Sequence, residues 1–246
     1  MSANDTPSAP LAAQQSGEPL DVADLDGVWQ RTLLLQPDGT SDTSTEVYWL
    51  QLNTLFGDIR SPAAIGPKDG QVRRCLCAFA GTLRKRDGEI FHWDQDWDCG
   101  LPADGWPDEG FLRWEGEVLR EDGVHEPYIE HWKLVAEPGE DDFACWLDDA
   151  SGKRAGLLIR MGAFAYCVSQ TSDNPETLRF LLFKQNADGW FLAATNGGDD
   201  PAGAGLTSRG LTWPQVLDLA GIKKPEAEEG EADDRSLSMN FEIQGA

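Results

Sequence analysis

Seven Asp-Gly pairs are spread along the 246-residue chain, and they constrain its fold more than any other feature. They stand at Asp26-Gly27, Asp38-Gly39, Asp69-Gly70, Asp87-Gly88, Asp104-Gly105, Asp122-Gly123 and Asp188-Gly189. Asp-Gly accepts the positive φ angles of tight hairpins, and aromatic and β-branched runs lie between most of the pairs. The spacing predicts an all-β, antiparallel up-and-down meander. Because large meanders remove their exposed edges by closing, we expect a barrel, a shape that holds small ligands.

Hydropathy patterning divides the chain into a terminal segment, a strand-rich body and an acidic insertion. Residues 1–20 are rich in Ala, Ser, Pro and Gln, which predicts a disordered segment, and residues 21–246 are expected to form a single β-barrel domain. Strands are predicted at about 27–36, 45–53, 56–60, 72–84, 88–97, 110–120, 127–136, 143–148, 155–161, 163–171, 177–185 and 189–195.

The C-terminal part carries the one helix that the pattern supports. Thr212 is a suitable N-cap, Pro214 suits the first turn, and the helix is expected to end at Gly221. Residues 222–235 form an acidic stretch that predicts a flexible insertion. Alternation of Met239, Phe241 and Ile243 with polar residues then predicts a last strand, which is expected to return and close the sheet.

The charge balance narrows the classes of partner. A formal net charge of -23 and a pI near 4.3 repel nucleic-acid phosphates and anionic lipid surfaces, so neither nucleic acid nor a membrane is an expected partner. The five cysteines are odd in number and scattered, which predicts free thiols and a cytoplasmic location. No basic and apolar leader is visible at the N-terminus.

Side-chain alternation along the predicted strands assigns an aromatic face to the barrel interior. The inward residues expected on this basis are Trp49 and Gln51; Phe91, Trp93, Gln95 and Trp97; Leu112 and Trp114; and Tyr128, Glu130 and Trp132. The ten tryptophans are expected to be mostly core, with a cage for an aromatic or cationic ligand as the alternative.

Glu130 is the most informative polar residue, because a carboxylate on an aromatic face needs a partner or a raised pKa. Arg31 and Arg60 are the candidate partners. One interpretation is a structural Arg–Glu pair, or a strand register that places Glu130 outside. The other is a polar group that orients a ligand in an apolar pocket.

Motifs for metal, cofactor or nucleophile chemistry do not emerge. The segment HEPYIEHW (125–132) has the wrong spacing for a zinc helix, and in an extended strand His125 and His131 lie roughly 20 Å apart. His92 and His131 are expected on outer faces. The sequence also has no nucleophile elbow and no phosphate-binding loop that opens a helix. We therefore predict neither a metal nor a cofactor.

Three segments together resemble a known family. GVWQRTLLLQPDG (27–39), TEVYWLQLNTLFGDIRSP (45–62) and YIEHWKL (128–134), in this order, are similar to calycin-like (lipocalin-like) β-barrel proteins of bacteria and fungi. The resemblance implies a single antiparallel barrel with a helix packed near one end. It implies little about activity.

Three functions are compatible with these patterns. The first is binding of a small, mainly apolar or aromatic molecule by Trp49, Gln51, Arg60, Trp93, Trp114 and Trp132. The second is a cofactor-independent enzyme of the isomerase, dehydratase or cyclase type, with Glu130 as acid or base and Tyr128 assisting. The third is a protein-interaction module that uses the outer surface.

Overall fold

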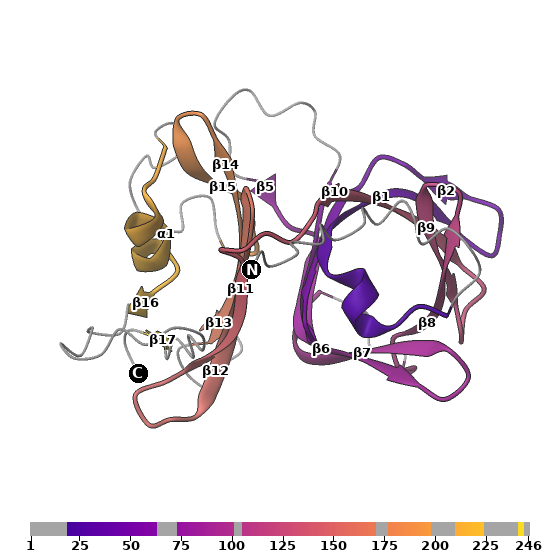
Figure 1. Ribbon diagram of the computed structural model, residues 1–246, viewed down its shortest axis with the longest axis horizontal. Helices are drawn as coiled ribbons and strands as arrows, with labels where there is room; N and C mark the ends of the chain where they lie inside the picture. Colours follow the sequence, from indigo (N-terminus) through magenta and orange to yellow (C-terminus); the bar gives the residue numbers. More distant parts are fainter. Residues whose placement is uncertain are drawn as a thin grey trace, which may run out of the picture.

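The computed structural model describes residues 19–62, 73–100, 105–170, 177–197 and 210–223, and the backbone of 241–243. Figure 1 looks along a closed barrel, with a second sheet standing beside it and a helix on the far side of that sheet. The all-β prediction is confirmed: strands dominate these residues, and the α-helix α1 (Trp213–Leu219) is short.

Eight antiparallel strands form the barrel. They are β1 (Gly27–Leu35), β3 (Glu46–Leu52), β4 (Leu55–Ser61), β6 (Cys77–Arg86), β7 (Ile90–Cys99), β8 (Glu109–Glu115), β9 (Val118–Gly123) and β10 (Ile129–Ala136). Pairing of β10 with β1 closes the ring, and the short β2 (Ser41–Asp42) pairs with β1 at its side. The closed meander predicted from the turn signals is therefore present, and it is complete by Ala136.

The strands after Ala136, together with a short strand from residues 73–74, form a separate open sheet, which differs from the expected barrel running to residue 246. Its strands are β11 (Phe143–Asp148), β12 (Arg154–Met161), β13 (Phe164–Gln170), β14 (Leu178–Asn186), β15 (Gly189–Thr195), β16 (Ile222–Lys223), β17 (Phe241–Ile243) and β5 (Arg73–Arg74). The last strand, β17, pairs with β11 and β16, so it extends this sheet and does not close the barrel. That residues 21–246 behave as one domain stays a prediction.

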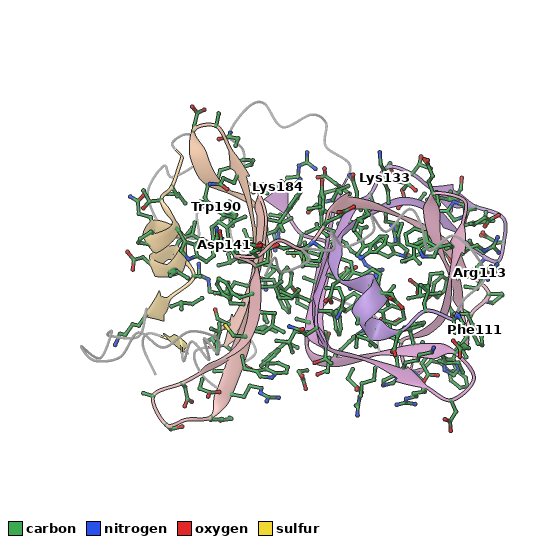
Figure 2. The ribbon with its side chains drawn as sticks, in the orientation of Figure 1. Phe111, Arg113, Lys133, Asp141, Lys184 and Trp190 are labelled. Carbon is green, nitrogen blue, oxygen red and sulfur yellow. The ribbon has the colours of Figure 1, made fainter. Side chains whose placement is uncertain are left out.

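Three apolar layers hold these parts together. One fills the barrel around Trp29, Trp49 and Phe91, and another lies between the barrel and the second sheet. The third lies between the second sheet and α1, where Figure 2 shows Trp190. Strands β3 and β4 are buried on both faces, whereas β8 and β10 alternate between buried and exposed positions. The second sheet therefore covers only one side of the barrel.

Two local features shift the predicted alternation. The predicted strand 110–120 is a hairpin of β8 and β9, because Gly116 adopts a φ of 66° in the turn. A β-bulge between the Ala80 and Gly81 pairs of β6 and β7 reverses the face of Trp97, which packs between barrel and sheet. Gly81 is required there, since a Cβ would meet the Asp94 carbonyl. Of the Asp-Gly pairs, Asp38-Gly39, Asp87-Gly88 and Asp188-Gly189 connect consecutive strands, as predicted.

One buried side chain joins the second sheet directly to the barrel wall. The Tyr166 hydroxyl of β13 lies 3.0 Å from the Phe79 carbonyl oxygen and 3.3 Å from that of Asp58. Its ring rests on Gly57 of β4, where an added Cβ would lie 2.3 Å from the ring. Glycine at this position allows the sheet to approach the barrel to contact distance.

The 3-10 helix and the α-helix given for the described residues both have capped N-termini. The 3-10 helix η2 (Val22–Leu25) has a capping box between Asp21 and Asp24, and Figure 1 shows it lying across the barrel opening. Leu20, expected in the disordered segment, is buried in the barrel core. Helix α1 begins after Thr212 with a capping box to Gln215, and Gly221 follows its C-cap, as predicted.

Three further points concern the cysteines, the segments predicted to be disordered or flexible, and membrane-spanning helices. All five cysteines are free, as predicted. Most of the acidic stretch 222–235, and residues 1–18, lie outside the described residues. In the part of the chain that is described, no helix has the length and apolarity needed to span a membrane.

We predict that Gly57→Ala destabilises the protein by about 1–3 kcal/mol, because the new methyl group overlaps the rigid Tyr166 ring. Gly139→Ala is the control, since the nearest atom to its added Cβ is 3.6 Å away. The free energy of unfolding from urea denaturation measures both effects. Equal stability of the two variants would contradict the tight contact.

Candidate functional site

The barrel encloses a cavity of about 570 Å³ that opens near the loop residues Trp106 and His125. Its wall is built by inward side chains of β3, β4, β6, β7, β9 and β10, together with residues 106–108 that precede β8. A cavity of this size matches those that hold small organic molecules. We therefore take it as the candidate site.

Three indole rings form one corner of the cavity. Trp49 of β3 lies at its centre, with the Trp93 ring 5.8 Å away at 70° and the Trp132 ring 5.5 Å away at 73°. All three line the cavity and are buried, as the alternation of their strands predicts. Trp49 Nε1 is a buried donor with no hydrogen-bond partner among the described residues. The corner thus offers apolar faces and one unsatisfied N–H donor.

Glu130 faces the cavity and is paired with Arg31. Arg31 Nη1 donates to Glu130 Oε1 over 2.6 Å, and Arg31 Nη2 lies 3.2 Å from Asp42 Oδ2. Arg31 and Glu130 are both buried, and they come from β1 and β10, the two strands that close the barrel. The inward register predicted for Glu130 is therefore correct, and Arg31 is its partner. Arg60, the other candidate, makes no ion pair with Glu130 within 4 Å.

Arg60 instead pairs with Asp58, two residues earlier on the same face of β4. Arg60 Nε lies 3.0 Å from Asp58 Oδ1, and its guanidinium lies over the Phe79 ring at 5.1 Å. Burial raises the pKa of Asp58, and the positive charge of Arg60 opposes that shift. This pair places one carboxylate and one guanidinium on the cavity wall.

Glu121 is a buried carboxylate held only by neutral donors. Tyr128 Oη donates to Glu121 Oε1 over 2.7 Å, and Trp132 Nε1 donates to Glu121 Oε2 over 3.0 Å. Glu121 also stands directly opposite Glu130 in the β9–β10 register. Burial, followed by the negative charges of Glu130 and Asp108, raises the pKa of Glu121 well above its ordinary value. Among the described residues, no Lys, Arg or His forms an ion pair with it.

Asp108 completes the group of carboxylates. Asp108 Oδ2 accepts a hydrogen bond from Gln95 Nε2 over 2.9 Å, and Gln95 lines the cavity on the same face of β7 as Trp93. Burial raises the pKa of Asp108 to about 6; Arg60 opposes the shift, while Glu130 and Asp58 add to it. The four carboxylates Asp58, Asp108, Glu121 and Glu130 therefore interact electrostatically inside one cavity.

Glu109 collects hydrogen bonds at the mouth. It lies 3.0 Å from His92 Nδ1, 3.0 Å from His125 Nε2 and 2.8 Å from Arg86 Nη1, while the Trp106 ring stacks on His125 at 4.9 Å. His92, expected on an outer face, is buried at this mouth instead. Across the described ranges, no three or more His, Cys, Asp or Glu side chains are grouped so as to hold a metal ion.

The predicted site residues divide into two groups. Trp49, Arg60, Trp93, Tyr128, Glu130 and Trp132 line the cavity, and their roles in binding or catalysis stay predictions. Gln51 and Trp114 are not among the lining residues. Gln51 Nε2 donates to the Asn53 carbonyl, and Trp114 packs on Trp29, because core side chains fill that part of the barrel.

Sequence reasoning missed Asp58, Glu121 and Asp108, whereas Gln95 lines the cavity on the face predicted for it. Asp58 precedes Arg60 by two residues, so its place on the same face was available from alternation. Glu121 was hidden by the single strand predicted over 110–120, which ends before it. Asp108 lies in a loop, where alternation gives no information.

Together, the closed ring of eight antiparallel strands and its internal cavity define a calycin-like (lipocalin-like) barrel, the fold that the resemblance implies. No family model matches the sequence, and none of the curated proteins is similar to it.

Two chains of solved structure are similar to this one. The uncharacterised protein YLR301w from Saccharomyces cerevisiae is 15% identical, with a TM-score of 0.53 over 89% of this chain and 97% of that one. At this identity the likeness shows a shared fold alone. A lipocalin-like protein from Bacteroides uniformis is 18% identical over 46% of this chain and 99% of that one, and its TM-score of 0.32 carries no argument.

We predict that Glu130→Gln destabilises the protein by about 3–5 kcal/mol, because it leaves the buried Arg31 guanidinium without its closest counter-charge. Glu117→Gln, at an exposed position in the β8–β9 turn, removes the same charge and should change stability by less than about 0.5 kcal/mol. Chemical denaturation measures the difference. A loss below about 1 kcal/mol for Glu130→Gln would mean that the pair is not structural.

A second prediction concerns Asp108 and pH. Since its pKa is raised to about 6 from an ordinary 3.8, the native state binds a proton more tightly than the unfolded state does. The stabilisation from that proton is complete below about pH 4 and is lost as the pH rises through about 6. Asp108→Asn should therefore be more stable than the wild type by about 1–2 kcal/mol at pH 7.5, and equally stable at pH 4.

Denaturation curves at both pH values test this expectation. Asn keeps an oxygen acceptor for Gln95, so the comparison isolates the charge. If the variant were the less stable protein at pH 7.5, attraction to Arg60 would outweigh burial of the carboxylate.

Proposed function

We propose that this protein binds a small, mainly apolar or aromatic molecule inside its barrel. The observation that carries the proposal is the cavity of about 570 Å³, in which the indole corner of Trp49, Trp93 and Trp132 stands beside hydrogen-bonded polar groups. An apolar wall supplies affinity, and a few fixed polar groups orient the ligand. The described wall combines both.

Binding of an uncharged aromatic probe tests the proposal. N-phenyl-1-naphthylamine should gain fluorescence with the wild-type protein. Trp93→Phe should weaken its binding about tenfold, because the lost ring contact is worth about 1.4 kcal/mol. Trp213→Phe is the matched control, since Trp213 packs on Trp190 and Phe143 beside α1, away from the cavity.

Two outcomes would contradict binding in the cavity: no fluorescence gain with the wild type, or equal weakening by the two substitutions. Native mass spectrometry of protein purified from its host provides an independent measurement. It should detect a retained mass that is lost on denaturation, and Trp93→Phe should reduce its occupancy.

Acid–base catalysis in the same cavity is the second candidate. The observation that favours it is the pKa of Asp108, which at about 6 lies in the range suited to a general acid or base. Glu130, proposed from the sequence for this role, has one oxygen bonded to Arg31, and Tyr128 donates to Glu121. Asp108 is therefore the better supported residue if turnover occurs. The interaction-module alternative stays a prediction.

A further inference from the structure

The positive side chains at the cavity do not neutralise all of its carboxylates. Arg31 pairs with Glu130, and Arg60 pairs with Asp58. That leaves Glu121 and Asp108, whose hydrogen-bond donors are the neutral groups of Tyr128, Trp132 and Gln95. Across the described residues neither carboxylate forms an ion pair within 4 Å. Two carboxylates therefore face a half-open cavity without a counter-ion of their own.

The rings beside these carboxylates suit a positive charge. The Trp132 indole donates its N–H to Glu121 while its ring stands at 73° to Trp49, so the carboxylate and the ring faces border the same space. Trp93 closes the other side of Trp49 at 70°. Indole faces attract cations by about 0.5–2 kcal/mol each, more strongly where water is excluded.

We propose that the ligand of this cavity is an organic cation, with an amine or amidine nitrogen held by Glu121 and Asp108 and an apolar body packed against Trp49, Trp93 and Trp132. The inference rests on the proposed function and deepens it, because it names the chemical class of the ligand. Trp49 lines the cavity and has a buried Nε1 without a hydrogen-bond partner among the described residues, so a ligand acceptor atom within reach of it would satisfy this donor.

Below about pH 6, a proton on Asp108 takes the place of the cation when the cavity is empty. Burial raises the pKa of Glu121 and of Asp108, and the groups that face them are Glu130, Asp58, Arg60 and Tyr128. A bound cation favours the ionised carboxylates and so displaces protons into solvent. Binding should therefore tighten as the pH rises through about 6. The histidines at the mouth, His92 and His125, bond to Glu109 and not to this pair.

Arg60 supports the opposite alternative, an anionic ligand. Its guanidinium lines the cavity, but its Nε is bonded to Asp58 and its face lies over Phe79. An anion next to Arg60 would also meet the field of Asp58, Asp108 and Glu130, which already interact with that guanidinium. The net charge of -23 adds a long-range field that attracts cations and repels anions. The cation is therefore favoured.

A matched series of three probes tests the class of ligand. The probes 2-phenylethylamine, 2-phenylethanol and 3-phenylpropanoate share a ring and a short chain and differ in charge. In isothermal titration calorimetry at pH 8, the amine should bind at least tenfold more tightly than the alcohol, and the carboxylate should bind most weakly. Amine binding should weaken at least tenfold at pH 5, with proton release measured by changing the buffer.

Three substitutions locate the effect. Asp108→Asn and Glu121→Gln should each weaken amine binding at least tenfold and change alcohol binding by less than twofold, which also verifies that the barrel is folded. Glu117→Gln removes one surface charge and should change neither. Glu121→Gln could weaken both probes, because Gln leaves Tyr128 and Trp132 with one acceptor oxygen instead of two. In that case the effect of Asp108→Asn on amine binding tests the proposal.

The outcomes separate this inference from the proposed function. Equal binding of amine and alcohol would overturn the cation and leave the cavity as a neutral binding site. Tightest binding of the carboxylate would assign the site to Arg60 and an anion. Absence of binding for all three probes would overturn the cation, and failure of N-phenyl-1-naphthylamine as well would overturn binding in the barrel altogether.

Discussion

The barrel depends on an ion pair that crosses its own seam. Arg31 and Glu130 are 99 residues apart, and they meet where β1 and β10 close the ring. A buried pair of this kind adds little net stability, because desolvation of both charges offsets their attraction. The pair acts on strand register: a one-residue slip of β10 would turn Glu130 outward and leave the buried Arg31 with Asp42 as its remaining counter-charge. The pair therefore selects one closed arrangement among several that hydrogen bonding alone permits.

Side-chain alternation was sufficient for much of the fold and for part of the cavity wall. Trp49, Trp93, Trp132 and Glu130 point inward as their strand patterns predict, because the barrel interior is apolar and the period of a strand is fixed. The helix after Thr212 was predictable for a similar reason, since its cap and its stop residue are local signals. Strand alternation and helix end signals both depend on residues that are close together in the chain.

The failures arose where tertiary contacts decide. Trp97 changes face because a bulge adds one residue to β7, and the residues around it in the sequence do not predict that bulge. The second sheet was missed although β3 carries the buried residues Tyr48 and Leu50 on the face opposite Trp49. A strand that is apolar on both faces requires a layer on each side, so that signal was present in the sequence. Glu121 and Asp108 carry no signature of their own, because their significance is the absence of a paired cation.

Contact with the second sheet makes the two sides of the barrel mechanically unequal. Tyr166 rests on Gly57 and bonds to carbonyls of β4 and β6, so these strands are fixed between two packed layers. On the other side, β8 has solvent on its outer face, where Phe111 is exposed and Figure 2 shows Arg113 at the outer surface. Bending is easier for a wall with one packed face than for a wall with two. We therefore expect the wall of β8 and β9, which carries Glu121, to open for an entering ligand more easily than the wall of β4 and β6.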